Sequence, residues 1–206
     1  MTREEQYQKD TQLISEYVRK NGGLVKAAEF AALGLDHRRV QQFVDDGLLR
    51  RIRNGHYCLA NDGADDDTII YRMFGADGIL TMESALYAYG YIKTKPYEYQ
   101  IAVDRNTSKS RFKLDYPFVH PYYTEAKALT MGVEEIEFGG GRMKIYDKER
   151  LVCECLKYEE HMDKEVLKQG LKSYIVEENQ NKLKLLMYAR ERRVYDKVMN
   201  RIGVWL

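Results

Sequence analysis

The sequence predicts an α+β protein with two domains: a mostly helical N-terminal domain that ends in a hairpin, and a mixed α+β domain with a helical tail. Three observations support this prediction. Helical patterns and an Asn-Gly hairpin occupy residues 1–60, an acidic glycine-containing linker occupies residues 61–68, and strand and helix patterns alternate over residues 69–206. The chain has 206 residues, of which 44% are hydrophobic, and this is enough for a buried core.

The N-terminal domain is predicted to contain three helices. Thr2 and Glu5 have the spacing of a capping box, and the helix that they begin ends at Gly22-Gly23. The segment VKAAEFAAL predicts a second, short helix, and Asp36 is placed to cap a third helix in DHRRVQQFVDDG. The buried face of this third helix is expected to consist of Val40, Phe43 and Val44.

A hairpin follows the third helix. Asn54-Gly55 lies between LLRRIR and HYCL and predicts a type I′ turn, in which both central residues need positive φ. Two helices, a turn, a third helix and a hairpin, in this order, predict a winged helix-turn-helix. Such a domain lays its third helix in the major groove of DNA, and its hairpin can reach phosphates or the minor groove. The predicted DNA-binding residues are Arg38, Arg39, Gln41, Gln42, Arg50, Arg51, Arg53 and Asn54.

Two other interpretations of this basic surface stay open. Arginines on an exposed hairpin can simply keep it soluble and protect the edge of a sheet. Winged-helix domains also serve as protein-docking modules. The neighbouring Arg-Arg and Gln-Gln pairs of the third helix favour DNA binding, because Arg pairs well with guanine and Gln with adenine.

The second domain is predicted to begin with a helix over TIIYRMFG, capped by the acidic linker, followed by a helix over TMESALYAYG. The segment YEYQIAV alternates as a half-buried strand does, and its inner face is expected to consist of Tyr97, Tyr99, Ile101 and Val103. VEEIEF, three glycines and RMKIY predict a second hairpin. From Asp147 onward the pattern is helical, beginning with an apolar stripe of Leu151, Val152, Cys155 and Leu156.

The last predicted helix carries a basic stripe with spacings of three, four and four residues: Arg190, Arg193, Lys197 and Arg201. No acidic residue is interleaved with the stripe. It is therefore expected to be a solvated face or to contact DNA phosphate or an acidic partner.

The sequence contains little that indicates an enzyme. The formal net charge of +1 gives no global attraction to nucleic acid or membrane, and the four histidines lack metal-ligand spacing. Asp115, Glu125 and Lys127 resemble the acidic residues and lysine of a metal-dependent nuclease site. However, TEAKAL favours a helix where such a site requires a strand. Asp65, Asp66 and Asp67 fit a helix cap better than a calcium loop. We therefore expect no catalytic site, no cofactor and no metal.

Cysteine usage and the N-terminus favour a cytoplasmic protein. The three cysteines form neither a disulfide framework nor a metal-ligand quartet. The sequence shows no signal-peptide core and no apolar run long enough to cross a bilayer.

Three separated blocks of sequence resemble one family. The first is GLVKAAEFAALGLDHRRVQQFVDDGLLRRIRNGHYCL, in which the matching residues are Gly47, Leu49, Arg51, Gly55 and Tyr57. The second is GILTMESALYAYGY, and the third is IYDKERLVCECLKY. In this order the blocks resemble the AbiEi-type antitoxins, whose N-terminal domain is a winged helix.

The resemblance implies an antitoxin of a type IV toxin-antitoxin system, which acts in abortive infection by phage. It also implies repression of the protein's own operon, through binding of the winged helix to inverted repeats in double-stranded operator DNA. The functional partner would be a nucleotidyltransferase-like toxin. The alternatives are a plain winged-helix regulator whose second domain binds a ligand or partner, and a metal-dependent nuclease.

Overall fold

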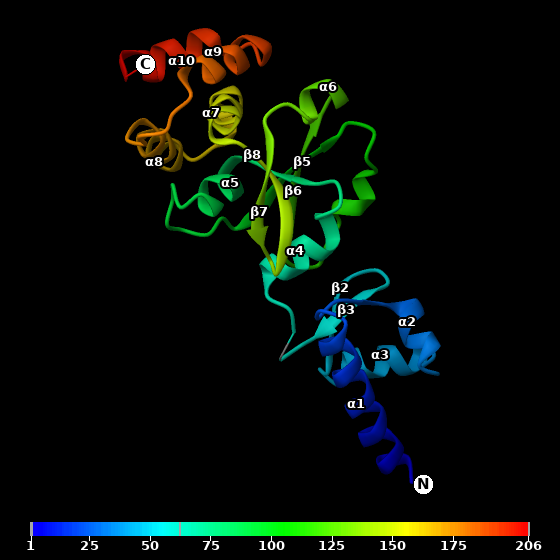
Figure 1. Cartoon of the computed structure of the whole chain (residues 1–206). Coiled ribbons are helices and arrows are strands. Elements are labelled where there is room, and N and C mark those ends of the chain that lie inside the picture. Colours follow the sequence, from blue (N-terminus) through cyan, green and yellow to red (C-terminus); the bar gives the residue numbers. More distant parts are fainter. Residues whose placement is uncertain (1, 62, 206) are drawn as a thin grey trace.

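The computed structural model describes residues 2–61 and 63–205. It is a mixed α+β structure with a small N-terminal unit and a larger second unit, as Figure 1 shows. The N-terminal helix and the last helices lie at opposite ends of the molecule (Figure 1). The α+β class predicted from the sequence is therefore confirmed.

The N-terminal unit consists of three helices and a small antiparallel sheet. The helices are α1 (Arg3–Lys20), α2 (Ala27–Ala32) and α3 (His37–Asp45). The strands are β1 (Val25–Lys26), β2 (Leu49–Arg53) and β3 (His56–Leu59), in the order β1-β3-β2. Side chains from all three helices and the sheet meet in one core, which includes Ile14, Val18, Phe30, Val40, Phe43, Leu49 and Tyr57.

The predicted helix caps of this unit are present. The Thr2 hydroxyl accepts a hydrogen bond from the Glu5 backbone N–H at 3.1 Å, and the Glu5 carboxylate accepts one from the Thr2 N–H at 2.8 Å. The Asp36 carboxylate accepts from the Arg39 N–H at 2.7 Å and so begins α3. Each bond satisfies a backbone donor that the first helical turn would otherwise leave unpaired. Val40 and Phe43 of α3 are buried, whereas Val44 is only partly buried.

The predicted type I′ turn is wrong. Gly55 has a φ of 74°, but within the described residues only Met82 and Arg193 among the non-glycines have positive φ, so Asn54 does not. The strand register also shifts between Arg51 and Arg53. The extra residue, Ile52, is fully buried with Cys58 and Ile69, so packing against the second unit accompanies the bulge.

The second unit is built on a five-stranded sheet in the order β6-β5-β4-β8-β7. Its strands are β4 (Ile79–Leu80), β5 (Glu98–Asp104), β6 (Phe118–Thr124), β7 (Val133–Phe138) and β8 (Gly141–Tyr146). The β4–β8 and β5–β6 pairs are parallel, and the β4–β5 and β7–β8 pairs are antiparallel. The β7–β8 pair is the second hairpin predicted from its glycines, and that prediction is confirmed.

Helices cover this sheet and form the tail (Figure 1). The α-helices of the second unit are α4 (Asp66–Phe74), α5 (Met82–Ala88), α6 (Ala126–Leu129), α7 (Lys148–Lys157), α8 (Lys164–Ile175), α9 (Lys182–Glu191) and α10 (Tyr195–Ile202). Short 3₁₀ segments lie at Lys109–Phe112, Glu159–His161 and Gly203–Trp205. The predicted helices over TMESALYAYG and from Asp147 onward are present, and the predicted apolar stripe of α7 is buried.

Two predictions for this unit need correction. Helix α4 begins at Asp66 with Asp65 as its N-cap, so residues 66–68 belong to a helix and not to an irregular linker. The half-buried strand predicted over YEYQIAV is instead buried on both faces as β5. Ile101 packs beside α4, and on the other face the Gln100 side-chain oxygen accepts a hydrogen bond from the Ser84 hydroxyl of α5. Tyr97 precedes this strand and is 82% exposed.

Candidate nucleic-acid interface

The outer face of α3 carries two exposed residues of the predicted DNA-binding set. Val40 and Phe43 pack into the core and fix the orientation of the helix, so Arg38 and Gln41 project into solvent on the opposite side. The Gln41 side-chain amide donates to the Asp45 carboxylate one turn later at 2.8 Å. This face therefore presents a guanidinium and an amide, the two groups best suited to reading purine edges.

The other two predicted α3 residues take part in a contact with α1. Arg39 donates through Nε and Nη2 to the Asp10 carboxylate at 3.1 and 2.9 Å, and its Nη1 donates to the Gln42 side-chain oxygen at 2.9 Å. Its guanidinium also lies 5.3 Å from the centre of the Tyr7 ring. The Arg39 and Asp10 side chains are 21% and 10% exposed. Arg39 thus holds α3 against α1, and the Gln42 oxygen is occupied.

The three hairpin arginines lie at the boundary between the two units. Arg51 forms an ion pair with Asp115 at 3.0 Å, and Arg53 donates to the Arg111 carbonyl at 3.2 Å. Arg50 lies over the Tyr116 ring, 5.6 Å from its centre. The sequence predicts DNA contacts for these side chains and gives no indication of this contact with the second unit. Asn54, at the tip of the hairpin, is exposed.

Apolar packing and a backbone hydrogen bond reinforce the same boundary. Ile52, Cys58 and Ile69 form a small buried cluster, to which Leu114 and Met73 of the second unit contribute. The Asp115 backbone N–H donates to the Ile52 carbonyl at 2.7 Å. The hairpin is therefore packed between its own domain and the segment before β6.

The predicted basic stripe on a single last helix is wrong. The chain turns between α9 and α10 at Arg193, whose φ is 59°, so Arg190 and Arg193 do not share a helix with Lys197 and Arg201. Lys197 and Arg201 pair with Glu159 at 3.0 and 2.8 Å, and their hydrogen bonds lower the pKa of the Glu159 carboxyl. Glu159, the acidic partner, lies outside α10, so the spacing of residues along the helix cannot predict it.

The two acidic residues of the nuclease-like set, Asp115 and Glu125, are engaged in ion pairs instead. Asp115 pairs with Arg51, and Glu125 pairs with Arg105 at 2.8 Å. Glu125 and Lys127 lie at the start of α6, a helix as TEAKAL predicts. Over residues 2–61 and 63–205, no group of three histidine, cysteine or acidic side chains has metal-binding geometry. The acidic linker residues make structural contacts: Asp65 caps α4, and Asp66 accepts from the hydroxyl of the distant Tyr116 at 2.6 Å.

A small domain whose capped helix presents Arg38 and Gln41 to solvent, beside an arginine-rich hairpin, has the features of a DNA-binding regulator. Residues 12–60 match the family model described as "Transcriptional regulator, AbiEi antitoxin". The chain is therefore similar to AbiEi-type antitoxins over this segment, and the predicted resemblance is confirmed. No curated protein matched the chain. Within the part of the chain that the structure describes, no helix is both long and apolar enough to cross a membrane.

Proposed function

We propose that the protein is a winged helix-turn-helix repressor of its own operon and the antitoxin of a type IV toxin-antitoxin pair. In this proposal α3 is the recognition helix and the β2–β3 hairpin is the wing. The α3 face carries the proposal, because Arg38 and Gln41 are exposed on a helix that its apolar side anchors in the core. The family description of residues 12–60 supports both the regulatory and the antitoxin role.

The recognition chemistry follows from the side chains on α3. A guanidinium donates two parallel hydrogen bonds to guanine O6 and N7, and a side-chain amide pairs with adenine N6 and N7. Arg38 and Gln41 are three positions apart and therefore lie on one side of the helix. Inverted repeats in double-stranded operator DNA would be read by two copies of this helix, and the wing arginines would add phosphate contacts.

The antitoxin role is assigned to the second domain. Its core is formed by the five-stranded sheet and its covering helices, and is separate from the core of the N-terminal unit. The functional partner would be a nucleotidyltransferase-like toxin, and the protein itself would act in the cytoplasm without catalysis or cofactor. The exposed side chains of Arg190 and Arg193 on this domain are the surface that we assign to an acidic partner.

A paired assay tests the division of roles. A promoter reporter and a growth assay with the co-expressed toxin are measured for Arg38→Ala/Gln41→Ala and for Arg190→Glu/Arg193→Glu. The first variant should lose repression and keep rescue, because it removes only contacts at an exposed helix face. The second should keep repression and lose rescue, because like charges in a contact repel. Circular dichroism confirms folding, and loss of rescue by a folded first variant would contradict the proposal.

A further inference from the structure

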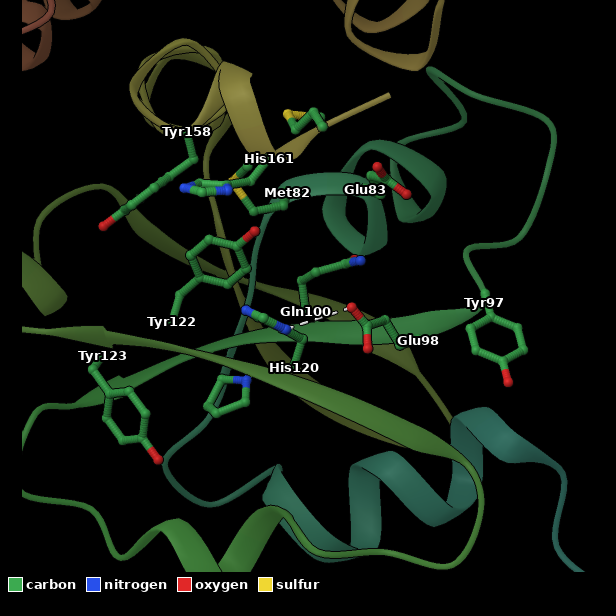
Figure 2. A pocket seen from close by; sticks show the side chains of 12 residues that line it. Met82, Glu83, Tyr97, Glu98, Gln100, His120, Tyr122, Tyr123, Tyr158 and His161 are labelled. Atoms are coloured by element: carbon green, nitrogen blue, oxygen red, sulfur yellow. Dashed lines mark ion pairs between the residues drawn. The ribbon is translucent and has the colours of Figure 1, made fainter. Parts of the chain in front are cut away.

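The second domain contains a cavity of about 650 Å³ that the proposed function does not use. Figure 2 shows it beside strands β5 and β6, with α5 and the segment after α7 contributing to its wall. Its size is that of a small-molecule site. Its polar lining consists of tyrosines, two carboxylates, the imidazoles of His120 and His161, and the Gln100 amide.

Aromatic rings form one side of the cavity. The Tyr122 and Tyr158 rings meet edge to face with their centres 5.0 Å apart, and the His120 ring lies 5.1 Å from that of Tyr122. Figure 2 shows these three side chains together at the cavity. Tyrosine rings present a negative face, which attracts cations.

Carboxylates give the cavity a negative charge. Glu83 is half-buried, and burial raises the pKa of its carboxyl. A hydrogen bond from the Asp163 backbone N–H lowers this pKa, whereas the nearby carboxylates of Asp163 and Glu98 raise it. The two charged groups that act on the Glu83 pKa, Asp163 and Glu98, are both acidic. Glu98 has an imidazole neighbour, with its Oε1 3.5 Å from the His120 Nδ1. A partly buried carboxylate surrounded by other acids is costly unless a cation joins it.

Backbone strain occurs at the same wall. Met82 lines the cavity, is 1% exposed, and has a φ of 50°, in the left-handed region that non-glycine residues rarely adopt. It precedes Glu83 at the start of α5. Such strain persists where surrounding packing enforces it, and it is concentrated at binding and catalytic sites.

We propose that this cavity binds a small organic amine in its primary alkylammonium form, with the carboxylates of Glu83 and Glu98 accepting its N–H groups and its carbon chain lying against Tyr122 and Tyr158. The carboxylates supply charge and hydrogen-bond acceptors, and the rings supply cation-π attraction and apolar contact. An anionic ligand is disfavoured, because both acidic side chains of the cavity would repel it. This inference is independent of DNA binding and of the antitoxin role.

Isothermal titration calorimetry with spermidine as the probe tests the proposal on the full-length protein. We expect saturable binding of one spermidine per chain. Two comparison molecules separate the contributions: choline carries a single positive charge and no N–H donor, and 1,8-octanediol has a similar chain but no charge. Spermidine should bind more tightly than either. N-acetyl-lysine amide is a third comparison, and tighter binding of that molecule would assign the site to a partner's lysine and overturn the proposal of a free amine.

Variants locate the binding. Glu83→Gln and Glu98→Gln should each weaken spermidine binding about tenfold, because each removes a charged hydrogen-bond acceptor. Tyr122→Leu should weaken it by a smaller factor through loss of the aromatic face. Glu137→Gln is the matched control, because this carboxylate is 82% exposed on β7 and its loss changes the net charge equally. Equal affinities in all four variants and the wild type, or no saturable binding at millimolar spermidine, would overturn the proposal.

Thermal unfolding of Glu83→Gln separates binding from folding. The pKa of Glu83 is raised in the folded state, so its ionised form opposes folding once the pH rises through that pKa. The amide removes this charge and keeps an acceptor for the Asp163 N–H. The variant should therefore be at least as stable as the wild type at neutral pH while binding spermidine more weakly. A variant that unfolds earlier than the wild type would contradict the assigned electrostatics of the cavity.

Discussion

The Arg51 guanidinium on β2 and the Asp115 carboxylate, 64 positions later, form an ion pair of 3.0 Å across the boundary between the two domains. Both side chains are about half exposed, at 53% and 54%, so solvent screens the pair and its contribution to stability is small, at about 0–1 kcal/mol. Its effect on the proposed DNA contact is larger. Asp115 already pairs with the Arg51 guanidinium that a DNA phosphate would otherwise bind. Asp115 and the phosphate therefore compete for Arg51.

Removing the charge of Asp115 should therefore strengthen DNA binding. We expect Asp115→Asn to raise affinity for both operator and random DNA roughly threefold, and to steepen the slope of log K against log salt by about 0.9 for one added phosphate contact. Fluorescence anisotropy over a salt series measures both quantities. Glu137→Gln controls for the change in net charge, and an equal gain in that variant would mean that the Arg51 pair has no special role.

Gln41 should read sequence. Gln41→Ala is expected to cost about 1–3 kcal/mol on operator DNA and little on random DNA, because the lost contact is to a base edge. Gln12→Ala on α1 is a closely matched control: its amide donates to Glu16 one turn later at 2.8 Å, as that of Gln41 does to Asp45. Binding assays on both DNAs decide the matter. Equal losses on the two sequences would remove Gln41 from base recognition.

The buried charges between α7 and α9 should dominate the stability of the second domain. Glu154 accepts from Arg150 at 2.8 Å, and a second arginine, Arg192, also donates to it; the three side chains are at most 8% exposed. Glu154→Gln leaves two buried guanidinium groups without a negative partner, at a cost of about 3–5 kcal/mol in the free energy of unfolding. Urea denaturation measures this change in the free energy of unfolding. Glu165→Gln, which alters an exposed pair with Lys168, should change stability by less than about 0.5 kcal/mol.

The three cysteines should be unreactive in the folded protein. Cys58, Cys153 and Cys155 are free and buried, and burial raises the pKa of the Cys153 thiol to about 12 and that of Cys155 further. Since the thiolate is the nucleophile, reaction with Ellman's reagent at pH 8 should be limited by unfolding. All three thiols should react at once in denaturant. Fast reaction of any one thiol without denaturant would show that its site opens.

The features that the sequence predicts correctly are formed by local interactions. The Thr2–Glu5 capping box, the Asp36 cap and the β7–β8 hairpin all depend on groups within a few residues of one another. The outward direction of Arg38 and Gln41 also followed from the helical period once Val40 and Phe43 were placed inside. These features were predictable because the backbone geometry alone brings the interacting groups together.

The contacts that the sequence does not predict join residues far apart along the chain. The sequence around Arg51 does not indicate that Asp115 is its partner. The sequence around Lys197 and Arg201 likewise does not indicate Glu159, which pairs with both of these basic residues. The spacing of the last basic residues suits one helix, but the chain turns at Arg193. Charge patterns along a sequence show which groups are available and do not show which of them are already paired.

Local sequence patterns predict the α+β class, the order of helices and hairpins, and the residue types of the candidate recognition helix. Contacts between distant segments establish which of those residues remain available: Arg38 and Gln41 stay exposed on α3, while Arg39 is bound to Asp10 and Arg51 to Asp115. It also assembled Glu83 with Tyr122 and Tyr158 around one cavity, although they come from three separate elements. The reason is that periodicity and capping act over single turns, whereas ion pairs and cavities depend on contacts between distant segments.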